Sequence, residues 1–342
     1  MPILSGGGTS GTPGNRGRRT RAGTGVPLIK AARWIGLGRV ECEDVPVPPV
    51  ADGEILVRTV YASICGSDLH EVFLETPPPS MPAGHPGHES VGEVVESRCP
   101  GFAPGDCVLT VPHAADGRCL SEFQALPGSA CVRLPATAEL SHLLMAQQLG
   151  TVVYALRRHP LDLVGRDVAV IGQGSAGAFF TFLLKRAGVA CVLVSDKSPA
   201  RLAYGRQLGA DLAVDAGSTD FRAAVLEETG GRGADLVVEA VGSRETFPLS
   251  LELAAAEASI LWFGLPEGGA DYPISFNDFF RRKLTAYSTY GAQGEPGLES
   301  FRYAVRLIAD AAIDVSRCSA TCCRSKKSVR PSASPANGPV TH

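Results

Sequence analysis

A glycine-rich turn between two apolar segments constrains the fold of this chain more than any other feature. The apolar segment Asp167–Ile171 reads as a buried strand, and a helix through residues 178–185 follows the turn Gly172-Gln173-Gly174-Ser175-Ala176-Gly177. A second apolar segment ends at Asp196, at about the twenty-residue spacing that separates such a turn from an acidic residue. This order of strand, turn, helix and acid predicts a doubly wound parallel sheet that binds a dinucleotide.

The three glycines of the turn have different tasks. Gly172 makes the tight bend, Gly174 lets the backbone approach a pyrophosphate, and Gly177 allows close packing of the helix on the strand. The N-terminus of the helix then stabilises the diphosphate. An ordinary strand–turn–helix with a capping aspartate is the alternative interpretation.

The residues around the later strands bear on the choice of dinucleotide. The carboxylate of Asp196 accepts hydrogen bonds from a ribose diol and repels a 2′-phosphate, so we expect NAD rather than NADP. Lys197 and Arg201 weaken that preference, because a cation at the ribose tolerates a phosphate. Two further apolar segments end at Val241 and Gly264, which we expect to line the nicotinamide pocket, with simple strand-terminating turns as the alternative.

The pattern of apolar residues divides the chain into two domains. Its 342 residues, 44% hydrophobic and 20% charged, are enough for two globular units. Short strands broken by glycine and proline predict a β-rich domain over residues 27–150. Strands and helices alternate over residues 151–290, which predicts a parallel sheet with helices on both faces. Residues 291–316 hold an amphipathic helix and the start of a strand, and we expect them to return to the first domain.

Composition excludes several classes of protein. No apolar run reaches the roughly 18 to 20 residues that cross a bilayer, and the N-terminus lacks the apolar core of a signal peptide. We therefore expect a cytoplasmic protein with no membrane partner, and its ten cysteines to be reduced thiols or metal ligands. Basic residues gather in two terminal segments, 16–21 and 317–330, and leave the body acidic, so we expect no nucleic-acid partner.

A second motif lies in the β-rich part. Ser63-Ile64-Cys65-Gly66-Ser67-Asp68-Leu69-His70 is followed by Gly84-His85-Pro86-Gly87-His88-Glu89-Ser90-Val91-Gly92. A cysteine thiolate and a histidine imidazole suit Zn²⁺ and leave a position open for a substrate oxygen, so Cys65 and His88 are the expected ligands. Each residue alone is better explained without a function, Cys65 as a buried thiol, His70 as a surface histidine and His88 as a core histidine, and only the combination predicts an active site.

These residues, with the downstream glycine turn, resemble the zinc-dependent medium-chain dehydrogenases, which include alcohol, sorbitol and threonine dehydrogenases. The resemblance covers about residues 28–316. It implies an α/β protein with a GroES-like β-rich catalytic domain and a Rossmann domain. It also implies hydride transfer between a nicotinamide cofactor and a small alcohol, polyol or hydroxy amino acid, in a homodimer or homotetramer.

The resemblance further implies roles for the residues around the two expected ligands. Ser67 would receive the substrate proton and His70 would relay it to solvent. Asp68 would orient an imidazole ligand, and Glu89 would be a carboxylate able to approach the metal. His85 does not match a ligand position of the family, so we expect it to be a loop residue.

Two departures from the family concern zinc. Gln147 stands where polyol-type members carry a glutamate as third protein ligand, and a neutral amide oxygen binds zinc less well than a carboxylate. The four closely spaced cysteines of the family's structural zinc have no counterpart, since Cys99, Cys107, Cys119 and Cys131 lie too far apart in sequence. We therefore expect one catalytic zinc and no structural zinc.

The two ends of the chain lack apolar periodicity. Residues 1–26 are rich in Gly, Ser, Thr and Arg, which predicts disorder, with a misplaced start codon or a basic interaction arm as alternatives. Residues 317–342 carry scattered Ser, Pro and Cys where the family completes its catalytic domain, and a shifted reading frame would give a helical pattern there. We favour a frameshift, which would leave the catalytic domain incomplete, over a natural disordered tail.

Two other functions remain open from the sequence. A metal-free NAD(P)-dependent quinone or enone reductase of the same superfamily is favoured if Gln147 cannot support zinc, although such a reductase has no need of Cys65, His88 and Glu89. A non-catalytic dinucleotide-binding protein would bind cofactor without turnover.

Overall fold

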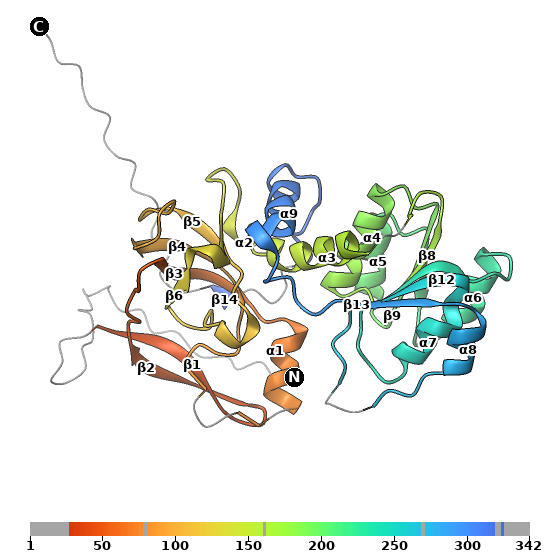
Figure 1. Ribbon diagram of the computed structural model, residues 1–342, viewed down its shortest axis with the longest axis horizontal. Helices are drawn as coiled ribbons and strands as arrows, with labels where there is room; N and C mark the ends of the chain where they lie inside the picture. Colours follow the sequence, from red (N-terminus) through yellow and green to blue (C-terminus); the bar gives the residue numbers. More distant parts are fainter. Residues whose placement is uncertain are drawn as a thin grey trace, which may run out of the picture.

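The computed structural model describes residues 27–74, 76–77, 81–159, 162–267, 271–318 and 323–324. The expectation of disorder over residues 1–26 lies outside this part of the chain, as does most of the segment on which the frameshift hypothesis rests. The described residues form two halves, each built on a β-sheet, with helices between them (Figure 1).

The N-terminal half is antiparallel. A two-stranded ribbon pairs β1 (Leu28–Gly36) with β2 (Arg39–Pro46). The larger sheet has the order β14-β3-β4-β5-β7, and β6 also pairs with β3. Its strands are β3 (Glu54–Ser63), β4 (Glu89–Ser97), β5 (Cys107–Thr110), β6 (Phe123–Pro127), β7 (Cys131–Arg133) and β14 (Cys323–Arg324). Short 3₁₀ turns η1 (Ala114–Asp116) and η2 (Gly128–Ala130) connect them.

The C-terminal half is a six-stranded parallel sheet of order β10-β9-β8-β11-β12-β13. Its strands are β8 (Asp167–Ile171), β9 (Cys191–Asp196), β10 (Leu212–Asp215), β11 (Ala234–Glu239), β12 (Ala254–Trp262) and β13 (Thr285–Ser288). The strand order reverses between β8 and β11, which is where such sheets bind ligands.

Alternation along β8 explains why helices cover both faces of the parallel sheet. Val168 and Val170 join one buried cluster with Phe180 of α4, whereas Ile171 joins another with Val225 of α6. The helices of this half are α4 (Ser175–Arg186), α5 (Pro199–Gln207), α6 (Phe221–Glu228), α7 (Thr246–Leu253) and α8 (Phe276–Arg281). The predicted combination of a β-rich half and a doubly wound parallel sheet is confirmed.

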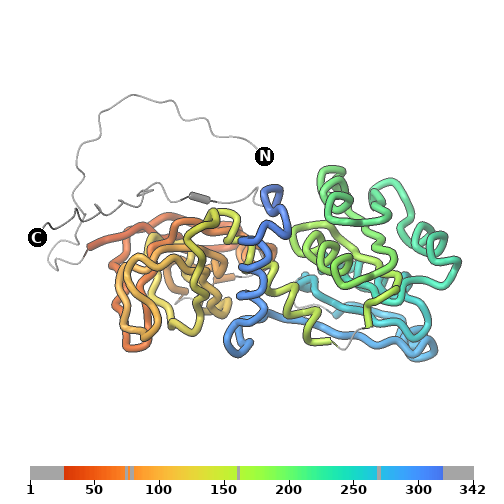
Figure 2. Tube along the Cα trace, turned by 90° about the horizontal axis from the view of Figure 1, so that it is seen from above, coloured from red at the N-terminus to blue at the C-terminus, as the bar shows by residue number. Residues whose placement is uncertain are grey.

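The helices between the halves are α2 (Leu140–Leu143), α3 (Ala146–Arg158) and α9 (Glu299–Ala309), which follows the 3₁₀ turn η3 (Pro296–Leu298). α9 crosses between the two halves (Figure 2) and packs closely on α3, where a Cβ at Gly150 would overlap Phe301. One buried cluster runs from Leu109 in the antiparallel sheet, through these helices, to the parallel sheet. The two halves share this core, so packing alone does not divide them. We propose domain boundaries near residues 150 and 290.

Among the described residues, no helix combines the length and the apolar character that crossing a membrane requires.

Candidate metal and dinucleotide site

The first group of candidate residues lies where β3 ends and α1 (Gly66–Leu74) begins. The backbone N–H of Cys65 donates to Oδ2 of Asp68 at 2.9 Å, a local turn of the kind that starts a helix. This turn places the half-buried Cys65 side chain immediately before α1, with its Sγ 2.7 Å from Oγ of Ser67. Asp68 is only 3% exposed, so its carboxylate is held in the interior behind the thiol.

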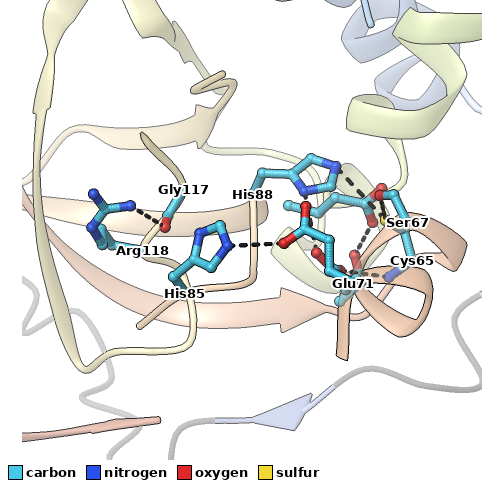
Figure 3. A network of polar contacts seen from close by, with 10 residues as sticks. Cys65, Ser67, Glu71, His85, His88, Gly117 and Arg118 are labelled. Atoms are coloured by element: carbon cyan, nitrogen blue, oxygen red, sulfur yellow. Dashed lines mark hydrogen bonds and ion pairs between the residues drawn. The ribbon is translucent and has the colours of Figure 1, made fainter. Parts of the chain in front are cut away.

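The second group lies in the loop that leads into β4. Gly84 and Gly87 have φ angles of +90° and +148°, and a Cβ at either would collide with the segment Arg118–Leu120. That segment also holds the loop through two backbone hydrogen bonds, from Cys119 to the carbonyl of Gly87 and from Leu120 to the carbonyl of Gly84. Glycine is therefore needed at both positions, and the loop presents His88 towards α1 (Figure 3).

The two groups meet in one buried cluster. Sγ of Cys65 lies 3.7 Å from Nε2 of His88, and the ligand atoms of Cys65, His88 and Glu89 all lie within 4.8 Å of one another. Zinc–sulfur and zinc–nitrogen bonds of about 2.3 and 2.05 Å place two ligands of a tetrahedral ion roughly 3.6 Å apart. The spacing of the thiol and imidazole therefore fits a shared zinc ion.

Other side chains orient the three donors. Nδ1 of His88 lies 3.3 Å from Oδ1 of Asp68, which leaves Nε2 directed at Cys65. The hydroxyl of Ser63 donates a hydrogen bond to Oε2 of Glu89. Such partners behind a metal ligand fix its tautomer and its direction.

The electrostatics of the cluster favour a positive charge at its centre. Burial raises the pKa of the Cys65 thiol and of the Glu89 carboxyl. For His88, burial acts to lower the pKa, but the hydrogen bonds with Asp68 and Cys65 outweigh it and raise the pKa to about 11. An imidazolium or a divalent cation can supply the charge that these donors favour.

The glycine turn has the geometry that a dinucleotide site requires. Gly172 has a φ of +90°, and a Cβ there would lie 2.6 Å from Val241. A Cβ at Gly177 would overlap the carbonyl of Gly172, so α4 packs directly on the turn. At Gly174, the N-cap of α4, a Cβ would meet no described atom within 4 Å, which leaves the helix N-terminus open to a ligand.

Asp196 lies beside this turn at the end of β9. Its Oδ2 accepts the N–H of Gln173 and its Oδ1 accepts the N–H of Ser198, both at 2.8 Å. Nη1 of Arg201 is 3.6 Å from Oδ2. The Asp196 carboxylate therefore stabilises the backbone of the glycine turn, and it also attracts the guanidinium of Arg201.

Comparison with known proteins identifies the family of the chain. The zinc-binding dehydrogenase family model matches residues 177–310, and the alcohol dehydrogenase GroES-like domain model matches residues 51–148. An L-threonine 3-dehydrogenase of Rhizobium etli is 28% identical, over 78% of this chain and 83% of that protein. The chain belongs to the zinc-dependent medium-chain dehydrogenases. It is an alcohol-type oxidoreductase that uses zinc and a nicotinamide cofactor.

Solved structures show the same fold. An alcohol dehydrogenase from Thermus sp. ATN1 has a TM-score of 0.74 and 24% identity, over 84% of this chain and 91% of that chain. A zinc-binding dehydrogenase from Sinorhizobium meliloti 1021, bound to NADP, has a TM-score of 0.73 and 24% identity, over 85% of this chain and 91% of that chain. The two-part architecture of this dehydrogenase is therefore that of its family.

Two residues with predicted roles lie outside the three-donor cluster. His70 is half-buried on α1, three residues after Ser67. Gln147 is in the first turn of α3 and only 2% exposed, and its Nε2 has no hydrogen-bond partner among the described residues. An amide in this state can turn about its last bond and offer its oxygen in place of its nitrogen.

Among the described residues, the cysteines outside the cluster form no second metal-binding group. Within the part of the chain that the structure describes, Cys65, His88 and Glu89 are the one set of histidine, cysteine and acidic side chains spaced to hold a metal ion. The absence of a structural zinc from this dehydrogenase stays a prediction of the sequence.

His85 differs from its expected character. It lies in a loop, as predicted, but it is only 2% exposed, and its Nε2 is 2.9 Å from Oε2 of Glu71 on α1. Its other ring nitrogen, Nδ1, has no partner among the described residues. The only sequence signal was an acidic residue three positions after Asp68, which places both carboxylates on one face of α1.

Two further polar residues were missed, Gln173 within the glycine-rich turn and Glu239 within an apolar segment. Gln173 is 1% exposed, and it donates to the carbonyl of Gly172 and accepts from the hydroxyl of Thr181. Glu239 is fully buried at the end of β11, where its Oε1 accepts the N–H groups of Val241 and Gly242 at 2.8 Å. Both side chains hold backbone turns at the carboxyl edge of the parallel sheet.

The two residues expected at the nicotinamide end lie on adjacent loops. Val241 is 49% exposed after β11, and Gly264 follows β12. A Cβ at Gly264 would overlap the backbone N of Gly242, so the two loops touch backbone to backbone. The structure thus brings both residues to the carboxyl ends of neighbouring strands.

Proposed function

We propose that this dehydrogenase transfers a hydride between NAD and a small alcohol, polyol or hydroxy amino acid. Its one zinc ion would be held by Cys65, His88 and Gln147, with Glu89 as an adjacent carboxylate able to approach the metal and one position open for the substrate. The observation that carries the proposal is the 3.7 Å separation of Cys65 Sγ and His88 Nε2, because it is the spacing of two donors on one tetrahedral ion. Asp68 behind His88 supports the same assignment.

The chain's own residues then have defined tasks in the reaction. When bound, zinc polarises a substrate hydroxyl and lowers its pKa. Oγ of Ser67, which lies 2.7 Å from Sγ of Cys65, would accept the substrate proton, and His70 further along α1 would pass it to solvent. One buried apolar core joins the half that carries these groups to the half that carries the parallel sheet.

The proposed cofactor is NAD, bound by Gly172, Gly174, Gly177, Asp196 and Arg201. The Asp196 carboxylate supports NAD, since each of its oxygens accepts one backbone N–H and keeps a lone pair for a ribose hydroxyl. Arg201, 3.6 Å from that carboxylate, is partly neutralised and so attracts a 2′-phosphate less strongly. Val241 and Gly264 would line the nicotinamide end.

The assembly is proposed to be a homodimer or homotetramer. β13 is an edge strand whose only described neighbour is β12, and the nearby helix α8 exposes 69% of Phe276 and 71% of Phe280. An open strand edge beside exposed aromatic side chains supports a contact between subunits. A cytoplasmic location stays a prediction of the sequence.

A substrate panel with both cofactors tests the function. Alcohols, polyols and hydroxy amino acids would be supplied with NAD or NADP, and cofactor reduction followed by absorbance. We expect turnover with NAD that a zinc chelator abolishes. Ser67→Ala is expected to lower kcat by about 100-fold or more while zinc content is unchanged, and Ser218→Ala, in an exposed loop, is expected to leave kcat unchanged.

Two other results would contradict the proposal. Reduction of quinones or enones that survives the chelator would identify the metal-free reductase, which the neutral Gln147 at the third ligand position favours. Cofactor binding without turnover on any member of the panel would identify a non-catalytic dinucleotide-binding protein.

A further inference from the structure

Two parallel contacts join α1 to the loop that carries His88. Asp68 and Glu71 are three residues apart, so they lie on the same face of α1. His85 and His88 are also three residues apart in the loop. The contacts pair Asp68 with His88 at 3.3 Å and Glu71 with His85 at 2.9 Å.

The contact between Glu71 and His85 is set in the interior. The His85 side chain is 3% exposed and that of Glu71 is 26% exposed. Figure 3 shows both histidines reaching from the loop, His85 towards Glu71 and His88 towards Cys65. A contact so placed is held by the surrounding structure, unlike an exposed pair whose long side chains move freely.

Burial of the His85 imidazole costs stability, because one of its ring nitrogens has no hydrogen-bond partner among the described residues. A buried polar nitrogen without a partner loses its hydrogen bonds to water and gains none in return. Nδ1 of His85 is in that state among the described residues, although backbone hydrogen bonds already hold the loop to Ala32, Cys119 and Leu120. The loop therefore does not need His85 merely to stay folded.

The spacing of the proposed zinc ligands depends on the distance between the loop and α1. Cys65 leads into α1, whereas His88 and Glu89 belong to the loop and β4, so the distance between donors depends on how these elements are held together. The backbone hydrogen bonds of the loop run to Ala32, Cys119 and Leu120, and the β3–β4 ladder pairs Ser63 with Glu89. Among the described residues, the contacts of the loop with α1 that fix its distance are those of side chains, His88 with Asp68 and His85 with Glu71.

We propose that Glu71 and His85 are a positioning pair that holds the His88 loop against α1, and so sets the affinity of the site for zinc. This inference rests on the zinc site of the proposed function. The pair matters here because Gln147 offers a neutral amide in place of a charged third ligand, so affinity depends more on preorganisation of the remaining donors.

The test is the zinc dissociation constant of purified full-length protein, measured by competition with a chromophoric chelator. Glu71→Ala is expected to weaken zinc binding about tenfold, and Glu71→Gln, which keeps a hydrogen-bond acceptor, by less. The matched control is Glu252→Ala, because Glu252 is also a helical glutamate paired with a basic residue of another element, Arg222. The control is expected to bind zinc as the wild type does.

Two readouts separate positioning from general stability. In the cobalt-substituted protein, Glu71→Ala should change the visible absorption of the metal, since the distance between thiolate and imidazole changes, while Glu71→Gln should change it little. His85→Gln should weaken zinc binding as Glu71→Ala does, and the double variant should be no weaker than either single variant, because both remove the same contact.

The outcomes distinguish this inference from the function on which it rests. Wild-type protein that binds no zinc would overturn both. Wild-type protein that binds zinc, with Glu71→Ala and Glu71→Gln of unchanged affinity and cobalt spectrum, would overturn the positioning pair alone. If Glu71→Ala does not fold, Glu71→Gln and His85→Gln decide between the same results.

Discussion

The dinucleotide turn and the metal cluster are built in opposite ways. The turn from Gly172 to Asp196 is continuous in sequence, and its main contacts join neighbouring strands, as in the hydrogen bond from Gln173 to Asp196. The metal cluster takes Cys65 from the end of β3, His88 and Glu89 from the start of β4, and leaves Gln147 on a helix of the middle region. A local motif therefore fixes its own geometry, whereas the metal site depends on contacts between separate elements.

Substitutions at the two sites are expected to change different properties of the protein. A change in the turn acts through the backbone of a single unit and is felt as strain or lost cofactor affinity. A change in the cluster acts through side chains that join α1 to the loop, so it alters metal binding before it alters the fold. Three substitutions, from the largest expected effect to the smallest, probe this contrast.

Asp68→Ala is expected to have the largest effect. Asp68 contacts both Nδ1 of His88 and the backbone N–H of Cys65, so its loss frees two donors at once. Zinc affinity should fall about 100-fold, with NAD affinity unchanged because the turn lies in the other half. Titration with zinc and with NAD on the same preparation checks both. A parallel loss of NAD affinity would show that the two sites are not independent.

Gly177→Ala is expected to destabilise the fold by about 2 kcal/mol, since its Cβ would overlap the carbonyl of Gly172. Gly174→Ala is the matched control, because a Cβ there meets no described atom within 4 Å. It should leave the free energy of unfolding unchanged and weaken NAD binding alone. Denaturant unfolding and NAD titration measure the two effects. Equal stability of the two variants would contradict the close packing of α4 on the turn.

Asp196→Asn is expected to have the smallest effect, a loss of about tenfold in the preference for NAD over NADP. The charge that repels a 2′-phosphate is removed, while one side-chain oxygen remains to brace the turn. The ratio of kcat/KM for the two cofactors is the measurement. Arg201→Ala should shift the ratio the other way, because it removes the exposed cation near Asp196. An unchanged ratio in both variants would place cofactor choice elsewhere.

The sequence predicted the continuous dinucleotide turn in more detail than the contacts around the metal cluster. The fold class and the parallel sheet followed from alternating apolar segments, and the tasks of Gly172, Gly174 and Gly177 followed from their place between strand and helix. His85 was predicted only as a loop residue, since its partner Glu71 belongs to an element that packs on the loop only in the folded chain. Pairings between distant segments leave little trace in one sequence.

Glu239 was missed for a different reason. It lies in the run 234–241, which the sequence shows only as a buried strand, and a charged residue at the strand end gives no sign of its partners. Its role depends on the N–H groups of Val241 and Gly242, which turn back towards it because Gly242 adopts a φ of +89°. Backbone groups that a side chain will meet are set by such local turns and cannot be read from residue types.

The most direct test of a zinc site at Cys65 and His88 is the zinc content per chain, by elemental analysis of purified protein. We predict about one zinc per chain in the wild type and little in Cys65→Ser, whose side chain is a poor zinc ligand. Cys42→Ser, a change at an exposed cysteine of β2, should keep its zinc. A folded, NAD-binding wild type without zinc, or a Cys65→Ser variant that keeps it, would contradict the account.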